Sequence, residues 1–599
     1  MVVSESLFYV VAAAALVLGN GLAVSGASEN SKVKVWPMPA SVSYGNAHLY
    51  LAGDFGLSSN HDSQILKDAF DRMLAVIKLD HVIDANFSAF DRSSLLQGLH
   101  IVVSSPNEEL QYGTDESYKL MVPSPEKPGY AHLEAKTVYG ALHGLQTFSQ
   151  LCYFSITRRV LEVHMSPWTI IDQPRFSYRG LLIDTSRHYL PMTVIKKVID
   201  SMSYAKLIHN LSLSRYLHTL NCGMVLIHPQ SDIQRPMQLK FYAQKRGISV
   251  LAEIDVPGHA LSWGVGYPSL WPSKNCQQPL DVSNEFTFKV IDGILSDFSK
   301  IFNFKFVHLG GDEVNTTCWT TTPRISKWLK RHRMNESQAY EYFVLRAQNI
   351  ALSHGYEIVN WLGVGVAQRV VESGLRCIVS NQDRWYLDHL DTPWQEFYIN
   401  EPLTNITNSK QQKLVIGGEV CMWGETADGS DIEQTIWPRA AAAAERLWTP
   451  FDKLAKNPRE ATGRLATFRC LLNQRGIAAA PLAGSGRAAP LDPVATDHFK
   501  ANLGGSDTIL PDLRHTRNVS GSGVGYGQGR TSTLEPLFRE RESWKLSQLL
   551  AGEEGRSTAR HRSGLPPAVE KKLPYLKINL APPPTRIHHP ILTTNPRIT

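Results

Sequence analysis

The sequence predicts an α/β protein whose largest part is a (β/α)8-type TIM barrel, and three observations support this fold class. Short apolar strands alternate with helical segments through the middle of the chain. Acidic and aromatic residues follow several of these strands, at the end where barrels gather their polar groups. The glycine-rich phosphate loop expected of the alternative, a doubly wound sheet, is not found in the sequence. We therefore divide the chain into a signal peptide (1–27), a smaller α/β domain (28–175), the barrel (176–490) and a tail (491–599).

The first residues have the pattern of a cleaved signal peptide. Residues 7–19 are continuously apolar, and the small residues Ser25, Gly26 and Ala27 follow. Glu5 stands where a basic residue is usual, which leaves a membrane anchor as the alternative, although the apolar run is short for a span. We expect entry into the secretory pathway, with the vacuole or the extracellular space as destination, and no stable membrane insertion after cleavage.

Six Asn-x-Ser/Thr sequons fit passage through a secretory lumen, and they begin at Asn86, Asn210, Asn315, Asn335, Asn405 and Asn518. Our candidate glycosylation sites are Asn86, Asn315, Asn335 and Asn405. The seven cysteines show no spacing typical of zinc. In an oxidising compartment some of them should pair, and the odd number leaves at least one unpaired. The net charge of +6 over 599 residues does not indicate nucleic-acid binding.

The region 28–175 mixes strand-like runs at 98–104 and 117–122 with helical patterns at 63–77 and 138–152. These patterns are typical of a compact α/β domain. Because catalytic residue types do not gather in it, we assign the chemistry to the barrel.

The first clear barrel strand covers residues 179–184 and leads into a helix over 191–205, whose first turn holds Pro191, where a missing N–H is harmless. Comparable strands are predicted at 247–255, 304–309, 356–361, 376–380 and 414–421, and further helices at 336–354, 365–373 and 439–447. Two stretches lack the hydrophobic periodicity of a strand or a helix. Residues 208–244 show no clear strand or helix, and the composition after residue 491, rich in Arg, Pro, Gly and Ser, predicts disorder.

Two adjacent acids, Asp312 and Glu313, follow the strand 304–309 and the turn formed by Gly310 and Gly311. The glycines remove two side chains, so a substrate can approach the backbone. A pocket that crowds two carboxylates raises the pKa of one and leaves the other ionised, which separates a proton donor from a charged acceptor. An isolated Asp-Glu pair is usually a solvated turn, but its position after a buried strand favours a catalytic site.

Aromatic residues with acidic neighbours recur near the ends of the predicted strands. They are Trp361, Tyr386 with Asp388, and Trp423 with Glu425. Sugar rings present C–H patches that stack on aromatic faces, and carboxylates accept hydrogen bonds from sugar hydroxyls. Single aromatic residues mostly belong to a core, whereas this recurrence favours a carbohydrate pocket.

Five motifs, in order, resemble those of the plant β-N-acetylhexosaminidases, a family of retaining, substrate-assisted glycosidases. The resemblance covers about residues 33–206 and 245–490. Its motifs are Arg179-Gly-Leu-Leu-Ile-Asp-Thr-Ser-Arg187-His188-Tyr189, Ala252-Glu-Ile-Asp255-Val-Pro-Gly-His259, His308-Leu-Gly-Gly-Asp312-Glu313, Trp385-Tyr-Leu-Asp388 and Trp423-Gly-Glu425. The resemblance implies an enzyme that removes terminal β-linked N-acetylglucosamine or N-acetylgalactosamine from glycans such as N-glycans and chito-oligosaccharides.

The resemblance also implies roles for single residues. Glu313 is implied as the general acid and then the base, Asp312 as the group that orients the 2-acetamido group, and His259 as a modulator of the acid. The implied substrate-binding residues are Arg187, Trp361, Tyr386, Asp388, Trp423 and Glu425. The resemblance further implies a disulfide between Cys276 and Cys318, no cofactor or metal, and the homodimer that many relatives form.

Three departures from the family pattern leave the barrel's completeness open. Residues 208–244 lack the expected second strand and its Trp-His-x-x-Asp motif, which holds the aspartate that would pair with His259. At the junction 360–361 about one strand and loop are missing, and Cys470 has no C-terminal partner cysteine. These departures are typical of altered splicing or of a faulty gene model. The alternatives to an active enzyme are therefore a non-catalytic glycan-binding protein and an inactive variant of the same family.

Overall fold

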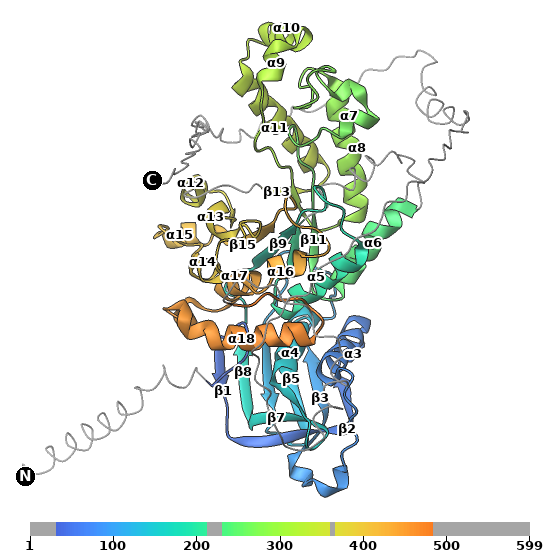
Figure 1. Cartoon of the computed structure of the whole chain (residues 1–599), viewed down its shortest axis with the longest axis vertical. Helices are drawn as coiled ribbons and strands as arrows, with labels where there is room; N and C mark the ends of the chain where they lie inside the picture. Colours follow the sequence, from blue (N-terminus) through green and yellow to red (C-terminus); the bar gives the residue numbers. More distant parts are fainter. Residues whose placement is uncertain (1–31, 212–230, 360–365, 483–599) are drawn as a thin grey trace, which may run out of the picture. The chain divides into compact units, whose positions relative to one another are not determined.

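The computed structural model describes residues 32–211, 231–359 and 366–482 of the chain (Figure 1). The predicted signal peptide, the predicted disordered tail, the junction 360–361 and Trp361 lie outside these described residues, as does Asn518. In the described ranges no helix is long and apolar enough to cross a membrane.

The N-terminal part is built on an eight-stranded sheet in the order β1-β8-β4-β5-β3-β2-β7-β6. Its strands are β1 (Ser41–Ser43), β2 (Ala47–Ser59), β3 (Leu95–Val103), β4 (Tyr118–Val122), β5 (Tyr130–Ala135), β6 (Cys152–Ser155), β7 (Val160–Ser166) and β8 (Trp168–Asp172). The pairs β2–β3 and β3–β5 are parallel and the other pairs antiparallel. Its apolar core is separate from the main core of the second sheet.

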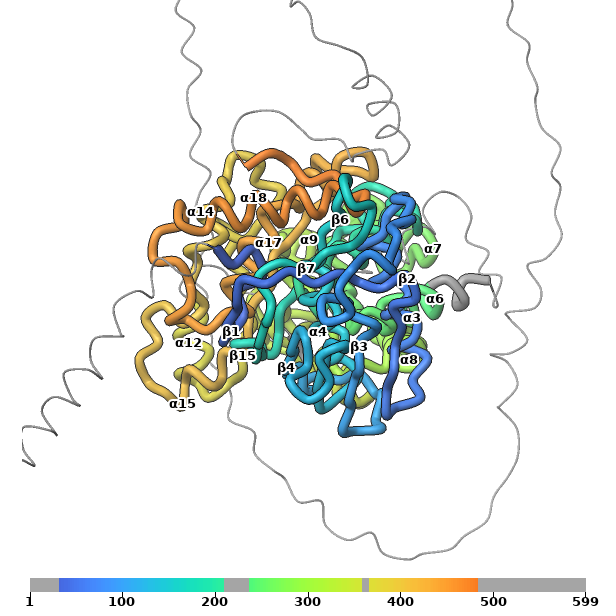
Figure 2. Tube along the Cα trace, turned by 90° about the horizontal axis from the view of Figure 1, so that it is seen from below, coloured from blue at the N-terminus to red at the C-terminus, as the bar shows by residue number. Residues whose placement is uncertain are grey.

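Two helices pack against each other beside this sheet, α3 (Gln64–Lys78) and α4 (Val138–Leu151) (Figure 2). Each begins at a side-chain cap that satisfies a backbone N–H left unpaired in the first turn. The Ser63 hydroxyl accepts from the Leu66 N–H, and the Thr137 hydroxyl accepts from the Gly140 N–H. The helical patterns at 63–77 and 138–152 therefore match helices that start at these caps.

The second sheet has seven parallel strands in the order β13-β12-β11-β10-β9-β15-β14. They are β9 (Tyr178–Ile183), β10 (His209–Leu211), β11 (Ser249–Glu253), β12 (Phe306–His308), β13 (Glu357–Val359), β14 (Cys377–Val379) and β15 (Val415–Met422). The strands β9, β11 and β15 are buried at every position. Burial on both faces is typical of parallel strands covered by helices, and it explains their continuous apolar patterns.

The helices of this part follow the strands as a (β/α) pattern requires. They are α5 (Met192–Tyr204), α6 (Ser231–Gln244), α7 (Trp263–Gly266), α8 (Glu285–Ile301), α9 (Thr317–Thr321), α10 (Pro323–His332), α11 (Glu336–Ser353), α12 (Val366–Glu372), α13 (Gln382–Trp385), α14 (Trp394–Ile399), α15 (Ser409–Gln412), α16 (Ile432–Ile436), α17 (Arg439–Trp448) and α18 (Pro458–Gln474). The alanine-rich run forms α17, which is almost wholly buried.

The expectation that residues 208–244 hold no second strand was wrong. β10 pairs in parallel with β9 on one side and β11 on the other, and α6 follows it at Ser231–Gln244. A segment of three residues is too short to show the hydrophobic alternation of a strand. Only its pairing with the neighbouring strands shows that β10 is one. The expected Trp-His-x-x-Asp position after β10 lies outside the described residues.

The seven strands do not close into a ring. Among the described residues, β13 and β14 each have a neighbouring strand on one side only. In the sequence these two strands flank the junction 360–361, where the missing strand was inferred. An eight-stranded barrel needs every strand paired on both sides, so among the described residues β13 and β14 are the two strands at which the ring is open.

Buried charges connect the two sheets. Arg179 on β9 is fully buried and makes an ion pair with Glu116, and Lys206 Nζ lies 2.9 Å from Asp172 Oδ2. The indole N–H of Trp448 also donates to Asp172. Burial alone would raise the pKa of Glu116, but Arg179 and His143 outweigh it and lower that pKa to about 2. The sheet domain therefore shares a polar core with the barrel.

Candidate active site

The loop that follows β12 carries the acid pair, and its backbone is tightly held. Gly310 and Gly311 both have positive φ, at 60° and 102°. A Cβ atom on Gly310 would overlap the carboxylate of Asp255. The Gly311 N–H donates to Asp255 Oδ1 at 2.9 Å, and the Tyr340 hydroxyl donates to the Gly311 carbonyl. The Gly-Gly turn is thus required by the close approach of the β11 loop.

Glu313 points away from the protein at the mouth of this loop. Its side chain is 78% exposed, and its backbone has a φ of 51°, a conformation that few residues other than glycine adopt. His259 Nε2 lies 3.6 Å from Glu313 Oε2, so the predicted histidine does reach the predicted acid. The exposed position lets Glu313 reach a leaving group that enters from solvent.

Asp312 and Asp255 lie close together, and Asp255 is half-buried whereas Asp312 is exposed. Desolvation by the surrounding protein raises the pKa of Asp312, although its side chain reaches the opening, and the nearby His259 partly opposes this. Burial raises the pKa of Asp255 well above its usual range, and repulsion from Asp312 and Glu253 adds to the effect. The pocket therefore raises the pKa of Asp312, the acid to which the resemblance assigns the orientation of the acetamido group and not the donation of the proton.

His259 has acidic neighbours despite the missing family aspartate. Single ligand atoms of Asp255, His259 and Asp312 all lie within 4.8 Å of one another. This set could hold a cation, but the raised pKa values of its two carboxyl groups disfavour the doubly ionised form that a cation needs.

A second buried pair supports the acid loop from below. Glu253 and His308 are register partners on β11 and β12, and their side chains meet at 2.9 Å between Oε1 and Nδ1. Burial alone would lower the pKa of His308, but Glu253 outweighs it and raises that pKa. Glu253 therefore favours the protonated form of His308, the residue that begins the acid motif.

Arg187 lies at the opposite wall, between two carboxylates. Its Nη1 atom lies 3.0 Å from Asp184 Oδ2 and its Nε atom 3.3 Å from Glu425 Oε1. Its guanidinium carbon lies 5.1 Å from the centre of the Trp423 ring. Asp184 also accepts from the Gly424 N–H at 3.0 Å, which ties the end of β9 to the end of β15. This geometry fixes Arg187 against the aromatic wall.

The aromatic wall continues to Tyr386, whose ring centre lies 6.0 Å from that of Trp423. A β-bridge joins Tyr386 to Cys421 on β15. Burial raises the pKa of Asp388, and Glu425 contributes in the same direction. The structure thus brings together five of the six predicted substrate-binding residues, while the sixth, Trp361, lies outside the described residues.

One small cavity joins the two walls. It is lined by Ser186, Arg187, Glu253, Asp255, His259, Trp263 and Trp423. No function was predicted from the sequence for four residues at this site, Asp184, Glu253, Asp255 and Trp263. A signal existed for the first three, because they are acids at the ends of β9 and β11 inside the quoted motifs.

The predicted disulfide is confirmed. Cys276 and Cys318 are bonded, with their Cα atoms 5.8 Å apart, and Cys318 lies five residues after Glu313 in the chain. The described cysteines Cys152, Cys377, Cys421 and Cys470 are free. The candidate glycosylation sites Asn86, Asn315, Asn335 and Asn405 are all exposed, and their modification stays a prediction.

A parallel sheet with an acid pair, a clamped arginine and tryptophan and tyrosine rings at its strand ends defines a glycosidase of barrel type. The sequence matches the catalytic domain of glycosyl hydrolase family 20 over residues 176–210, 226–368 and 357–451. It also matches a domain described as beta-acetyl hexosaminidase like over residues 35–151. The chain belongs to glycosyl hydrolase family 20.

Individual proteins agree with this assignment. Beta-hexosaminidase 3 of Arabidopsis thaliana is 63% identical over 508 residues, covering 78% of this chain and 95% of the relative. Beta-hexosaminidase 1 of the same plant is 47% identical over 498 residues, covering 75% and 91%. The crystal structure of a Flavobacterium johnsoniae chitobiase matches with a TM-score of 0.62 at 24% identity, covering 75% of this chain and 74% of that one. The last match supports the fold: a TIM-barrel domain with an N-terminal domain.

Proposed function

We propose that this protein is a β-N-acetylhexosaminidase that hydrolyses terminal, non-reducing β-linked N-acetylglucosamine or N-acetylgalactosamine from glycans. Membership of glycosyl hydrolase family 20 supports a substrate-assisted, retaining reaction. The observation that carries the proposal is the arrangement of Asp312 and Glu313 after β12, with His259 3.6 Å from Glu313.

The reaction begins with a proton on Glu313. Glu313 gives this proton to the glycosidic oxygen as the bond from that oxygen to the anomeric carbon breaks. The oxygen of the substrate's own 2-acetamido group forms a new bond to the anomeric carbon from the opposite face. Water then attacks the anomeric carbon, Glu313 takes a proton from the water, and the acetamido group is restored. Two displacements give net retention.

Asp312 fits the task of holding the acetamido group. Its carboxyl group lies at the opening beside Asp255 and His259, and the surrounding protein partly desolvates it, so a hydrogen bond from the acetamido N–H is stronger there than in water. As charge develops on the acetamido group, a negative Asp312 stabilises it. His259, next to Asp312 and Glu313, stabilises their anionic forms and so influences when Glu313 gives up its proton.

The remaining residues fit the recognition of the sugar. Arg187 presents a forked donor to ring hydroxyls, and Glu425 accepts from them. Trp423 offers a ring face to the sugar, Tyr386 donates to the acetamido carbonyl, and Asp388 assists nearby. Arg187 is positioned for this by Asp184 and Trp423 before any substrate binds.

Release of the chromophore from an aryl N-acetyl-β-glucosaminide by the purified full chain tests the proposal. Glu313→Gln should lower kcat by about 10²–10⁴-fold, because it removes the proton that the leaving oxygen needs. Glu336→Gln, a change at the start of α11, is the matched control and should leave kcat unchanged. An unchanged rate in Glu313→Gln would contradict the assignment.

A non-catalytic glycan-binding protein is the second candidate. Its support is the interruption between β13 and β14, which an active barrel has to tolerate. Saturable binding of N-acetylglucosamine by the wild-type chain without turnover would favour this candidate. Failure of the chain to give a cooperative unfolding transition would instead favour an inactive variant of the family.

The surroundings of the reaction belong to the same proposal. We place the protein in the secretory pathway, in the vacuole or outside the cell, as a glycoprotein that acts on N-glycans or chito-oligosaccharides and forms a homodimer. The exposed sequons at Asn86 and Asn335 support the glycosylation. A mass shift after glycosidase treatment of the native protein tests the glycosylation, and light scattering of its solution tests the homodimer.

A further inference from the structure

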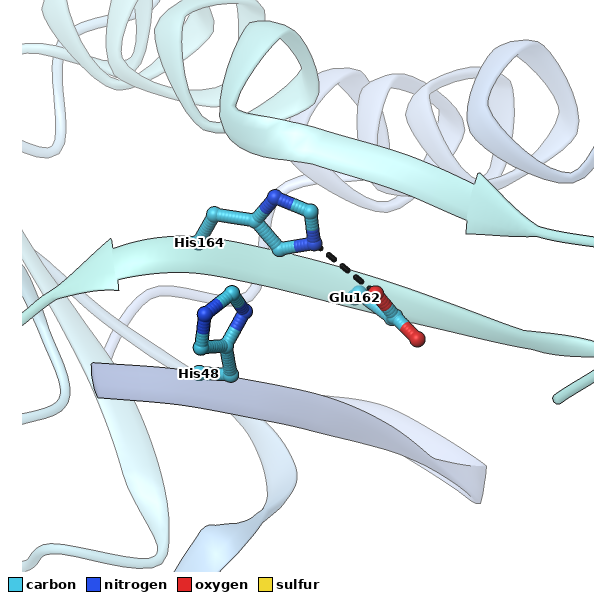
Figure 3. Close-up of side chains that lie close together, drawn as sticks. All are labelled: His48, Glu162 and His164. Atoms are coloured by element: carbon cyan, nitrogen blue, oxygen red, sulfur yellow. Dashed lines mark hydrogen bonds and ion pairs between the residues drawn. The ribbon is translucent and has the colours of Figure 1, made fainter. Parts of the chain in front are cut away.

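Outside the barrel, three side chains on the eight-stranded sheet converge in a way that the hydrolysis does not use. They are His48 on β2 and Glu162 and His164 on β7 (Figure 3). We propose that these residues form a binding site for a divalent transition metal of the zinc class. Two imidazoles and one carboxylate are a zinc donor set, and a water would complete the four positions.

Strand geometry places the three residues on one face. Glu162 and His164 are two apart on β7, so their side chains leave the strand on the same side. The pairing of β2 with β7 is irregular at this point, because Ala47 faces Ser166 whereas Leu49 faces Val163. The extra residue in β7 forms a bulge between Val163 and Ser166. His48 lies opposite this stretch, where its ring meets that of His164.

The distances suit a site that closes on an ion. His164 Nε2 lies 2.8 Å from Glu162 Oε2, and the rings of His48 and His164 have centres 4.5 Å apart. Single ligand atoms of all three residues lie within 4.8 Å of one another. Donors bonded to zinc at about 2.0–2.2 Å lie roughly 3.3 Å apart in a tetrahedron. His48 is exposed, so rotation of its side chain can supply the required contraction.

The neighbours hold Glu162 as a ligand without filling the site. Arg158 Nη1 lies 3.2 Å from Oε1, the oxygen that His164 does not use, so Oε2 faces the two histidines. Burial alone would raise the pKa of Glu162, but hydrogen bonds from His164, Ser155 and Arg158 lower it. The cation Arg158 beside Oε1 thus favours the carboxylate form that a metal ligand must have. The ring of Tyr153 lies 5.4 Å from that of His164 and limits its movement.

The site lies on the sheet domain, whereas the acid pair follows β12 of the second sheet. A metal here would link β2 to β7 and stabilise the sheet domain rather than take part in hydrolysis. No sequence motif indicates this site, since His48 is separated from Glu162 by more than a hundred residues and matches no short ligand spacing.

The test is zinc binding by the full, tag-free chain after removal of metal with a chelator. Equilibrium dialysis should show one tightly bound zinc per chain, cobalt should give the visible bands of a tetrahedral ion, and zinc should raise the thermal midpoint. His48→Ala should weaken zinc binding at least about 100-fold, because a site with one imidazole and one carboxylate is left. Its circular dichroism and rate of hydrolysis should match the wild type.

A second His-His-Glu group on the same sheet provides the matched control. His100 and His132 have ring centres 5.4 Å apart, and His132 meets Glu134 at 2.9 Å, but His100 is engaged with the Ser58 hydroxyl. His100→Ala should bind zinc as the wild type does. Equal loss of zinc in His100→Ala and His48→Ala, or unchanged binding in a folded His48→Ala, would overturn the proposal.

Discussion

The two sheets of this protein differ in how completely they are built. In the eight-stranded sheet the described strands pair in one uninterrupted order, and both helices beside it begin at side-chain caps. In the seven-stranded sheet the pairing stops at β13 and β14, next to the junction 360–361. The acid pair nevertheless lies in the second sheet. Contacts from β11 and β15 therefore fix the side chains of the site even where the pairing of the sheet around it stops.

The buried charges between the sheets give the largest effect on stability. Arg179→Met removes one partner and leaves Glu116 buried beside His143 alone. Breaking a buried ion pair in this way should lower the free energy of unfolding by about 3–5 kcal/mol. Denaturant titration measures the change, with Lys67→Met, whose ion pair with Asp62 is exposed on both sides, as control.

If the two sheets unfold as one unit, Arg179→Met shifts a single transition. Two separate transitions in the wild type would show that the seven-stranded sheet unfolds independently. The two sheets would then belong to two domains of different stability.

The disulfide between Cys276 and Cys318 lies close in sequence to the acid pair, and its removal shows how much it stabilises the protein. Replacing both Cys276 and Cys318 by Ser should lower the free energy of unfolding by about 3 kcal/mol, because the bond no longer restricts the unfolded chain. Thermal unfolding with and without reductant measures it. The wild type under reductant should behave as the double variant does, and the double variant itself should not respond to reductant. A wild type whose thermal midpoint does not change under reductant would contradict the stabilisation by this disulfide.

Acid should weaken the link between the sheets. The pKa of Glu116 in the folded protein is about 2, below its ordinary value of 4.5, so its contribution to stability is complete above about pH 4.5 and is lost as the pH falls toward 2. A shift of this size corresponds to a loss on the order of 3 kcal/mol. Unfolding measured between pH 6 and pH 2.5 tests this, and Glu116→Gln should remove this part of the acid sensitivity.

Arg187→Lys should give the smallest of these effects and leave the fold unchanged. Lysine keeps the charge but cannot contact Asp184 and Glu425 as a fork while lying on Trp423. We expect kcat/KM to fall about 10-fold, a change of roughly 1.4 kcal/mol, mainly through KM. Lys197→Arg on α5, whose partner Glu433 lies outside the site, is the control. Equal effects of both changes would exclude a specific role for Arg187.

Local patterns predicted the longer elements and the position of the chemistry. The helix patterns at 63–77, 138–152 and 336–354 correspond to α3, α4 and α11, because capping and amphipathic spacing act within a few residues. The strand before Asp312 was predicted for the same reason. The three-residue strand β10 was missed, because parallel pairing with β9 and β11 is not a property of its own sequence.

Four features can be recognised from the sequence alone: the acid pair, the Gly-Gly turn before it, the aromatic and acidic residues at the strand ends, and through them the family. Which charges meet depends on how the chain folds. The tertiary structure set Asp255 under Gly310, so the glycines have a steric reason, and it set Glu253 against His308 and Arg187 between Asp184 and Glu425. It also brought His48 to His164 and Glu162 across a bulge. The physical reason is that the pKa of a carboxyl group depends on burial and on neighbours within a few ångströms, and in a parallel sheet those neighbours come from distant parts of the chain.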